Sequence, residues 1–390
     1  MTRRATLLCI GILAACSGSP APPAAPQAGL TAPATGPTAT IQGSPSLTHT
    51  PSAEIRSEEV SFLAGGRSIH GTVTVPAAPG TYPGLLLLAG SGPTDRDWNT
   101  KLLPGKNGSG RLLAERLTRH GVVVLRFDKM GTGRTAPPKT VTWGGFLQEA
   151  TAALAMLRHR SDVDRARIVV AGHSEGGLHA LRLGQQEGHA LRGVMLLSSV
   201  GRNYGDLMLS QIEASFRKEG GLSGEPLANF MKPIRKAFAD FAAGKTVDPR
   251  TVGPFPAIQR LVASLVNPAS VGLVRPLLAF APSKAIATLK VPVLVLGGAK
   301  DIQVDPTIDG VLLRDAAKNA GVTVTYVAAP DADHVLKHEA KSLKVLVADR
   351  GATGRGYNKA GRVLDPASVK AMVTWLVAQT AVVSTSPPAP

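Results

Sequence analysis

The sequence feature that most constrains this chain is a short run in which β-forming residues meet a serine flanked by glycines. Residues 168–171 read Ile-Val-Val-Ala, and Gly172, Ser174 and Gly176 follow in a Gly-X-Ser-X-Gly spacing. Leu178 then begins an apolar helical face. A serine in this context occupies a tight strand-to-helix turn whose neighbours must be nearly free of side chain. The alternative is an ordinary turn with an idle serine, but the strand-turn-helix context favours Ser174 as a nucleophile with an outward hydroxyl.

A nucleophilic serine needs a histidine to take its proton and an acid to orient that histidine. One known arrangement around a Gly-X-Ser-X-Gly turn has the chain order serine, acid, histidine. Asp301 follows a predicted strand at residues 291–296, and His334 lies in the loop beyond a predicted strand at residues 322–328. We therefore predict that Ser174, Asp301 and His334 meet at the carboxyl edge of the sheet. Other candidates are Asp305, Asp331 and Asp333 for the acid and His338, expected in a polar helical stretch, for the base.

Two backbone amides are expected to stabilise the negative charge that develops during acyl transfer. The amide of Glu175 lies at the start of the helix after the serine, and Ser91 lies in the polar, glycine-rich loop 90–98 after a buried strand. Asp95, Arg96 and Asp97 in that loop are expected to hold it by ion pairs. His173 has its side chain directed away from that of Ser174 in this type of turn, so we assign it a packing role.

The order of elements predicts an α/β fold with a mostly parallel, doubly wound sheet. An edge hairpin at residues 60–75 precedes apolar strands at 83–89, 121–127, 168–171, 191–198, 291–296 and 322–328, with helices between them. The alternation stops between residues 201 and 287, where two amphipathic helices and several prolines predict a helical cap over the carboxyl edge. The apolar residues of this cap could form a satellite core or contact substrate. The predicted core comprises residues 58–200 and 288–379.

The N-terminus has the pattern of a bacterial lipoprotein signal. Residues 1–15 combine two arginines with a short apolar stretch, and Cys16 follows small residues at the predicted cleavage and lipidation site. Residues 17–53 carry no charged side chain and are rich in proline, alanine, serine and threonine, so residues 16–57 are expected to form a disordered tether. Residues 380–390 are expected to form a disordered tail.

Charge and spacing exclude several other classes of function. The formal net charge is +16, but the basic residues are scattered and aromatic residues make up 4%, which is unlike a nucleic-acid surface. The glycines at 131 and 133 lack the Gly-Lys-Ser/Thr spacing of a phosphate loop. Asp331, Asp333 and His334 form one cluster without a second group of ligands, so no metal or other cofactor is expected.

Four motifs together resemble the bacterial α/β-hydrolase family, and specifically its secreted or envelope esterases related to serine-aminopeptidase-like hydrolases. They are Gly-Ser-Gly-Pro-Thr-Asp-Arg-Asp at 90–97, Arg-Phe-Asp-Lys-Met-Gly-Thr-Gly at 126–133, Gly-His-Ser-Glu-Gly-Gly at 172–177, and Gly-Ala-Lys-Asp-Ile-Gln-Val at 298–304 with Asp-His at 333–334. The resemblance covers residues 58–377 and implies Ser174, Asp301 and His334 as the triad. Ala89 and Met130 depart from residues frequent in the family, histidine and arginine, which weakens inference about substrate.

The sequence thus predicts a serine hydrolase that cleaves small-molecule carboxylic esters and is attached to the cell envelope through lipid on Cys16. The membrane would be the outer membrane in a Gram-negative cell and the plasma membrane otherwise. One alternative is a peptidase or amidase with the same triad; an acidic pair in the cap that would read a substrate amino terminus is not evident, and Asp206 and Glu213 are no more than candidates for it. The other is an envelope-binding protein that retains an inactive hydrolase fold. The sequence does not indicate an oligomeric state.

Overall fold

The computed structural model of the 390-residue chain describes residues 54–218 and 220–381. The predicted signal peptide, Cys16 and the tether up to residue 53 lie outside the described residues, as does the tail from residue 382. The folded part begins three residues earlier than residue 58, because the first strand pairs from Ile55, opposite Pro76 of its partner. It also extends beyond residue 379, since the last helix includes Thr380, whose hydroxyl donates to the Leu376 carbonyl.

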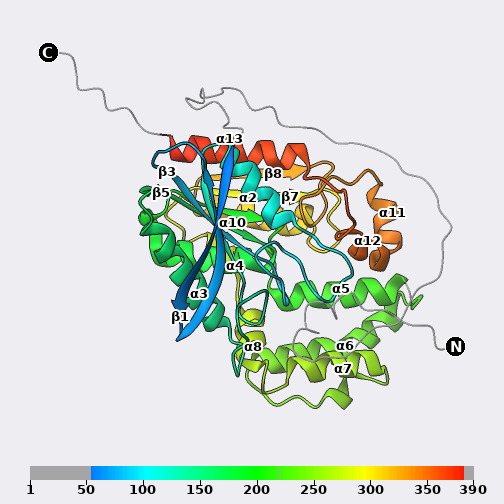
Figure 1. The fold of residues 1–390 in the computed structure, drawn as a ribbon. Helices are drawn as coiled ribbons and strands as arrows, with labels where there is room; N and C mark the ends of the chain where they lie inside the picture. Colours follow the sequence, from blue (N-terminus) through cyan, green and yellow to red (C-terminus); the bar gives the residue numbers. More distant parts are fainter. Residues whose placement is uncertain (1–53, 219, 382–390) are drawn as a thin grey trace.

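One eight-stranded sheet organises the fold, in the order β1-β2-β4-β3-β5-β6-β7-β8 (Figure 1). The first two strands form the antiparallel edge hairpin, and all pairs from β4 to β8 are parallel. This arrangement confirms the predicted mostly parallel sheet. The strands are β1 (Ile55–Ala64), β2 (Arg67–Pro76), β3 (Tyr82–Leu88), β4 (Val123–Phe127), β5 (Val163–His173), β6 (Gly193–Leu197), β7 (Val293–Gly298) and β8 (Val324–Ala329).

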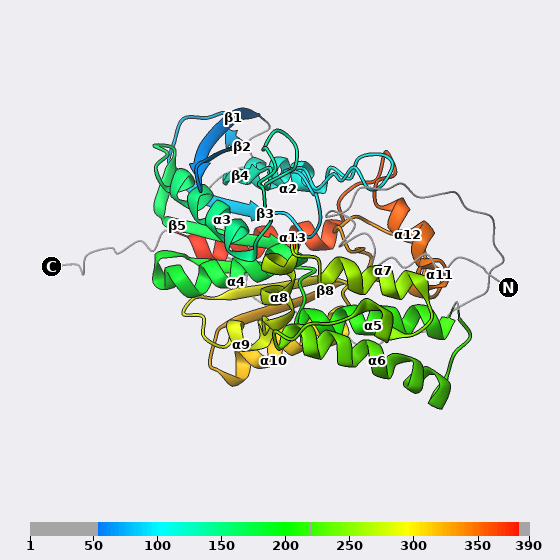
Figure 2. The same cartoon turned by 90° about the horizontal axis from the view of Figure 1, so that it is seen from below.

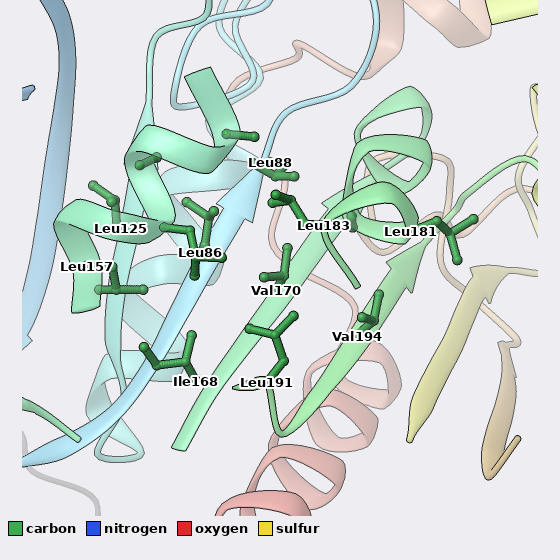
Figure 3. Packing of buried hydrophobic residues seen from close by; sticks show 14 of the residues in the cluster. Leu86, Leu88, Leu125, Leu157, Ile168, Val170, Leu181, Leu183, Leu191 and Val194 are labelled. Atoms are coloured by element: carbon green, nitrogen blue, oxygen red, sulfur yellow. The ribbon is translucent and has the colours of Figure 1, made fainter. Parts of the chain in front are cut away.

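Helices cover both faces of the sheet, which explains the continuous apolar runs of the central strands. In β3, Leu85 and Leu87 face α2 (Ser109–Arg119) and α13 (Pro366–Thr380). Leu86 and Leu88 belong to the opposite cluster, with α3 (Trp143–Arg158), α4 (Glu175–Glu187) and α10 (Val311–Asn319). Figure 3 shows Leu86 on this second face beside Val170 of β5. Side chains alternate between faces along a strand, so a strand covered on both faces has no polar side.

The cap contains α5 (Tyr204–Lys218), α6 (Gly224–Ala242), the 3₁₀ turn η3 (Pro249–Val252), α7 (Pro256–Leu265) and α8 (Val271–Ala279). Figures 1 and 2 show α5, α6 and α7 grouped together, and Figure 1 shows them away from α13. Their buried side chains form a separate apolar cluster that reaches the rest of the fold through Trp143, Leu178, Val200 and Val304. The apolar residues of the cap therefore form a satellite core. The short helix α9 (Pro282–Ile286), which fell within the predicted cap, packs instead on the sheet through Ala285 and Ile286.

The segment between β8 and α13 differs from prediction. His338 was expected in a helical stretch, but it pairs in an extended bridge with Ala332, because Asp331 and Asp333 fold the chain back on itself. Helical structure begins later, with α11 (Leu343–Ala348) and α12 (Arg350–Gly356), neither of which was predicted. None of the helices among the described residues is long and apolar enough to cross a membrane.

Candidate active site

Ser174 occupies the turn between β5 and α4 with a φ of 53°, a value that side-chain-bearing residues rarely adopt. Its flanking glycines are required by close packing. A Cβ on Gly172 would lie 2.1 Å from the Gly176 carbonyl oxygen, and a Cβ on Gly176 would lie 2.5 Å from the Ala89 carbonyl oxygen. The Ser174 amide donates to the Leu197 carbonyl at 2.8 Å, which ties the turn to the neighbouring strand. The sequence thus holds Ser174 in a strained conformation typical of a nucleophile.

His334 and Asp301 form a buried hydrogen-bonded pair. Nδ1 of His334 lies 2.7 Å from Oδ2 of Asp301, and both residues are 5% exposed. The other oxygen of Asp301 accepts from the amides of Gln303 and Val304, at 2.7 and 3.0 Å. With three hydrogen bonds to its oxygens, the Asp301 carboxylate is held in one orientation as an acceptor. It can therefore keep the proton of His334 on Nδ1 and leave Nε2 free to accept a proton.

The three predicted residues come from loops at the same edge of the sheet. Ser174 follows β5, Asp301 follows β7 and His334 follows β8, which is the edge where open α/β sheets place their ligands. Within the described part of the chain, His334 is hydrogen-bonded to Asp301 but not to Ser174. Such contacts are commonly long without substrate and tighten in the reactive complex.

His173 links the serine turn to His334. Its Nε2 donates to the His334 carbonyl at 2.8 Å, and its ring stacks on Trp98 with 4.2 Å between centroids. Burial, with the nearby His334 and Lys129, lowers the pKa of His173 from 6.5 to about 3, so the ring stays neutral at physiological pH. The predicted packing role agrees with this geometry, and the contact also positions the backbone of His334.

The two predicted amide donors are unpaired in the part of the chain that the structure describes. Among residues 54–218 and 220–381, neither the Ser91 amide nor the Glu175 amide makes a hydrogen bond. Glu175 is the first residue of α4, where backbone amides lack intrahelical partners. The loop carrying Ser91 approaches the serine closely, because a Cβ on Gly90 would lie 3.2 Å from the Ser174 Cβ. Both donors are thus available to a ligand at Ser174.

Sequence reasoning missed a buried lysine beneath this loop. Lys129 follows β4 and its Nζ donates to the carbonyls of Gly90 and Gly92, the second at 3.0 Å. Its side chain also lies over the Phe146 ring, 5.3 Å from the centroid. Burial lowers the pKa of Lys129, while Glu175 and Glu149 act in the opposite direction. The only signal in the sequence was a charged residue directly after an apolar strand.

Ion pairs hold the rest of loop 90–98, as predicted. Nη2 of Arg96 lies 2.8 Å from Asp128, and Nε of Arg126 lies 2.9 Å from Asp97. The oxygens of Asp95 accept within the loop itself, from the amides of Asp97 and Asn99. These contacts fix the far part of the loop, whereas Lys129 fixes the part next to Ser174.

The alternative acids and base lie in other contacts. Asp305 accepts from Thr307 at the start of the π-helical turn η4 (Pro306–Gly310), and Asp331 pairs with Lys300 at 2.7 Å. Asp333 pairs with Arg362 at 2.6 Å; burial raises its pKa, while Arg362 opposes this. The His338 side chain is 45% exposed and lies 3.9 Å from Asp365. The structure therefore brings Asp301 to His334 and directs the other candidates elsewhere.

Glu213 and the residues that were considered for a metal site have other partners in the structure. Glu213 of α5 pairs with Arg217 at 3.0 Å and with Arg235 of α6, so it faces the exposed side of the cap. No group of three or more His, Cys, Asp or Glu side chains within the described ranges is arranged to hold a metal ion. Of the cluster considered for a metal in the sequence, Asp331 contacts Lys300, Asp333 contacts Arg362 and His334 contacts Asp301.

Comparisons with protein families and with known proteins show what this chain is similar to. Residues 85–344, more than half of the chain, match the profile described as the Alpha/beta hydrolase family. The chain is 28% identical to Esterase EstD of Thermotoga maritima over 157 residues, which are 40% of this chain and 36% of that protein. It is 32% identical to the uncharacterized protein YfhR of Escherichia coli over 113 residues, 28% of this chain and 39% of that protein.

The chain therefore spans less than half the length of these two relatives. Among solved structures, a thermostable esterase from Pseudomonas putida aligns with a TM-score of 0.47 and 19% identity, covering 86% of each chain.

Proposed function

Because this chain belongs to the alpha/beta hydrolase family, we propose that it is a serine hydrolase that cleaves carboxylic esters through an acyl-enzyme on Ser174. The sequence similarity to an esterase supports the reaction class. The observation that carries the proposal is the 2.7 Å hydrogen bond between His334 and Asp301 at the same sheet edge as the strained Ser174. A base, an oriented acid and an activated hydroxyl are the groups that acyl transfer requires.

The proposed reaction has two steps. Oγ of Ser174 attacks the ester carbonyl carbon and its proton passes to Nε2 of His334. The tetrahedral intermediate then expels the alcohol, which takes the proton from His334 and leaves an acyl group on Ser174. Water loses a proton to His334, attacks the acyl carbon and releases the carboxylic acid as Ser174 regains its proton. Asp301 holds Nδ1–H throughout and stabilises the imidazolium.

The oxygen of the tetrahedral intermediate is proposed to accept from the amides of Ser91 and Glu175. Neither amide has a hydrogen-bond partner among the described residues; Glu175 follows Ser174 directly, and a Cβ on Gly90, next to Ser91, would lie 3.2 Å from the Ser174 Cβ. A fixed donor pair stabilises the transition state without a reorganisation cost, and loss of one donor typically lowers kcat by about 10²–10³-fold. Ligand binding at this place would satisfy both amides together.

The test combines covalent labelling with turnover. The full chain and Ser174→Ala are treated with a fluorophosphonate probe and assayed with p-nitrophenyl esters of short and long acids. We expect labelling and turnover in the wild type and neither in Ser174→Ala. His334→Ala should behave like Ser174→Ala, whereas His338→Ala, which alters an exposed histidine, should retain activity. Labelling or turnover that survives in Ser174→Ala would refute the proposal, and a parallel series of aminoacyl amides measures ester against amide preference.

A further inference from the structure

Lys129 contacts the loop next to Ser174 in a way that fixes one peptide group. Its Nζ donates to the Gly90 carbonyl, and the amide of that same peptide belongs to Ser91. In a trans peptide, the carbonyl and the amide point in opposite directions in one rigid plane. Cis peptide bonds are absent from the described residues. Holding the Gly90 oxygen from one side therefore sets the direction of the Ser91 N–H on the other.

We propose, on the basis of the proposed function, that Lys129 is a positioning residue that orients and polarises the Gly90–Ser91 peptide so that its N–H stabilises the reaction oxyanion. A cation on the carbonyl oxygen draws electron density through the peptide and strengthens its N–H as a donor, as in other chains of hydrogen bonds at low dielectric. The second bond, to the Gly92 carbonyl at 3.0 Å, holds the next turn of the loop against the same ammonium group.

The surroundings of Lys129 suit a fixed charge. The residue is 7% exposed, and its ammonium faces Glu149 of α3 and Glu175 of α4, while His173 of β5 lies nearby. Arg67 of β2 pairs with Glu149 at 3.5 Å from the other side. Two carboxylates thus support one buried lysine.

The loop has a second set of anchors, so Lys129 is not needed merely to keep it folded. Arg96 and Asp97 already bind Asp128 and Arg126 through ion pairs at the far end of the loop. Among the side chains that the structure describes, Lys129 is the one that donates to the Gly90 carbonyl, in the peptide next to Ser174, where a Cβ on Gly90 would approach the Ser174 side chain at 3.2 Å. A purely structural bond would stabilise the fold, whereas this bond also controls the transition state.

The decisive variant is Lys129→Met, which keeps the apolar stem and removes the donor and charge. For a short p-nitrophenyl ester we expect kcat to fall by roughly 10- to 100-fold with KM nearly unchanged, less than the cost of deleting an oxyanion donor outright. The rate of fluorophosphonate labelling should fall in parallel, because attack of Ser174 on the probe also develops negative charge on an oxygen that the Ser91 amide would stabilise. Lys129→Arg, which retains a charged donor, should recover part of the loss.

Arg275→Met is the matched control. Arg275 of α8 also donates to a backbone carbonyl, that of Phe241 at 3.0 Å, and also lies over an aromatic ring, that of Phe241, but it belongs to the cap and not to a loop beside Ser174. We expect this variant to lose a comparable amount of stability. Its kcat should change by less than about threefold, because a packing defect away from the reacting groups weakens the fold without changing the stabilisation of the transition state. Equal losses of kcat in the two variants would overturn the proposal.

The pH profile gives a readout that a structural role would not change. Burial lowers the pKa of Lys129, so its charge should be lost at high pH and kcat of the wild type should fall on that limb. The limb should disappear in Lys129→Met and move to higher pH in Lys129→Arg. If Lys129→Met does not fold, the proposal is tested by comparing the fall of kcat at high pH in the wild type with that in Lys129→Arg. Absence of a limb, or the same limb in all folded variants, contradicts the proposal.

These outcomes are separable from failure of the proposed function. If Ser174→Ala keeps labelling and turnover, the function itself is wrong. If Ser174→Ala is inactive but folded Lys129→Met has wild-type kcat, the function stands and the role of Lys129 is refuted.

Discussion

The loops at the carboxyl edge of the sheet and the helical cap use opposite means of holding their shape. The edge loops bury polar groups and pair them, as with Asp301 and His334 or Lys129 and its carbonyls. The cap buries an apolar cluster and leaves its ion pairs, such as Lys245 with Asp240, exposed at the surface. Exposed pairs contribute little, whereas buried polar contacts are costly to break. The comparison predicts that edge substitutions act on the reaction and cap substitutions act on stability.

The two regions are joined at a buried ion pair. Asp309 of η4 is fully buried and accepts from Arg202 at 2.8 Å and from the amides of Gly201 and Arg202. A Cβ on Gly201 would lie 2.1 Å from the Asp309 carbonyl oxygen, so the chain enters the cap in close contact with the core. This junction keeps the cap beside the sheet edge while its own core remains separate.

The largest effect is expected from Asp301→Asn. Asparagine can keep its oxygen toward the amides of Gln303 and Val304, which leaves its NH₂ facing Nδ1 of His334. Nδ1 must then accept, the proton moves to Nε2, and His334 cannot take the proton of Ser174. We expect kcat to fall by about 10⁴-fold with little change in folding, as for other triads with this change.

Asp305→Asn is the control, because Asp305 lies in the same loop but caps η4 through Thr307. Steady-state kinetics on one ester should show less than about threefold change in kcat for this variant. A similar loss in both variants would mean that the loop as a whole, rather than the Asp301 carboxylate, supports the reaction.

Phe238→Ala tests the other side of the comparison. Phe238 is 4% exposed in the cap cluster, and its truncation should lower the free energy of unfolding by about 3–5 kcal/mol. For a short ester, kcat of the folded protein should change by less than about threefold, because Phe238 of α6 packs within the cap cluster. Denaturant unfolding followed by circular dichroism gives the first quantity, and assays well below the transition give the second.

Leu196→Ala provides the matching change in the sheet. Leu196 is fully buried and its strand pairs with β5 at Gly172, beside the serine turn. A similar loss of stability, about 2–5 kcal/mol, should here be accompanied by a larger fall in kcat. If Phe238→Ala lowers kcat as much as Leu196→Ala does, the two regions are not separable.

The features that the sequence could predict depend on local patterns or on the topology of the parallel sheet. The strands were predictable because continuous apolar runs such as residues 83–89 require cover on both faces, and the serine turn because Gly172 and Gly176 leave no room for a Cβ. The pairing of Asp301 with His334 was predicted from their positions after the last two strands, together with the chain order serine, acid, histidine that is known for this type of turn. These are local patterns or consequences of parallel topology.

What the sequence did not predict depends on contacts between distant residues. Lys129 binds carbonyls 37 and 39 residues away, and no local pattern marks a lysine that does so. α11 and α12 are too short, at six and seven residues, to show clear periodicity. His338 was placed in a helix because its neighbours are polar, but the turn made by Asp333 pairs it with Ala332.

The smallest effect expected is a loss of stability in mild acid that arises in the core and not in the cap. His173 has its pKa lowered from 6.5 to about 3 by burial and by nearby positive groups. The folded state therefore favours the neutral ring. The stabilisation is complete above pH 6.5 and is lost as the pH falls toward 3, with a loss of roughly 2 kcal/mol by pH 5. Residues 201–287 contain no histidine, so the cap has no group that titrates in this way.

His173→Gln isolates this contribution, because the glutamine amide can still donate to the His334 carbonyl but does not titrate. Denaturant unfolding at pH 7 and pH 5 should show a smaller difference for His173→Gln than for the wild type. His120, whose pKa is also lowered by burial and by Arg116, contributes with the same sign and remains in both proteins. An unchanged difference in His173→Gln would show that acid acts elsewhere, and the buried polar contacts beside Ser174 would then not be the acid-sensitive part of the fold.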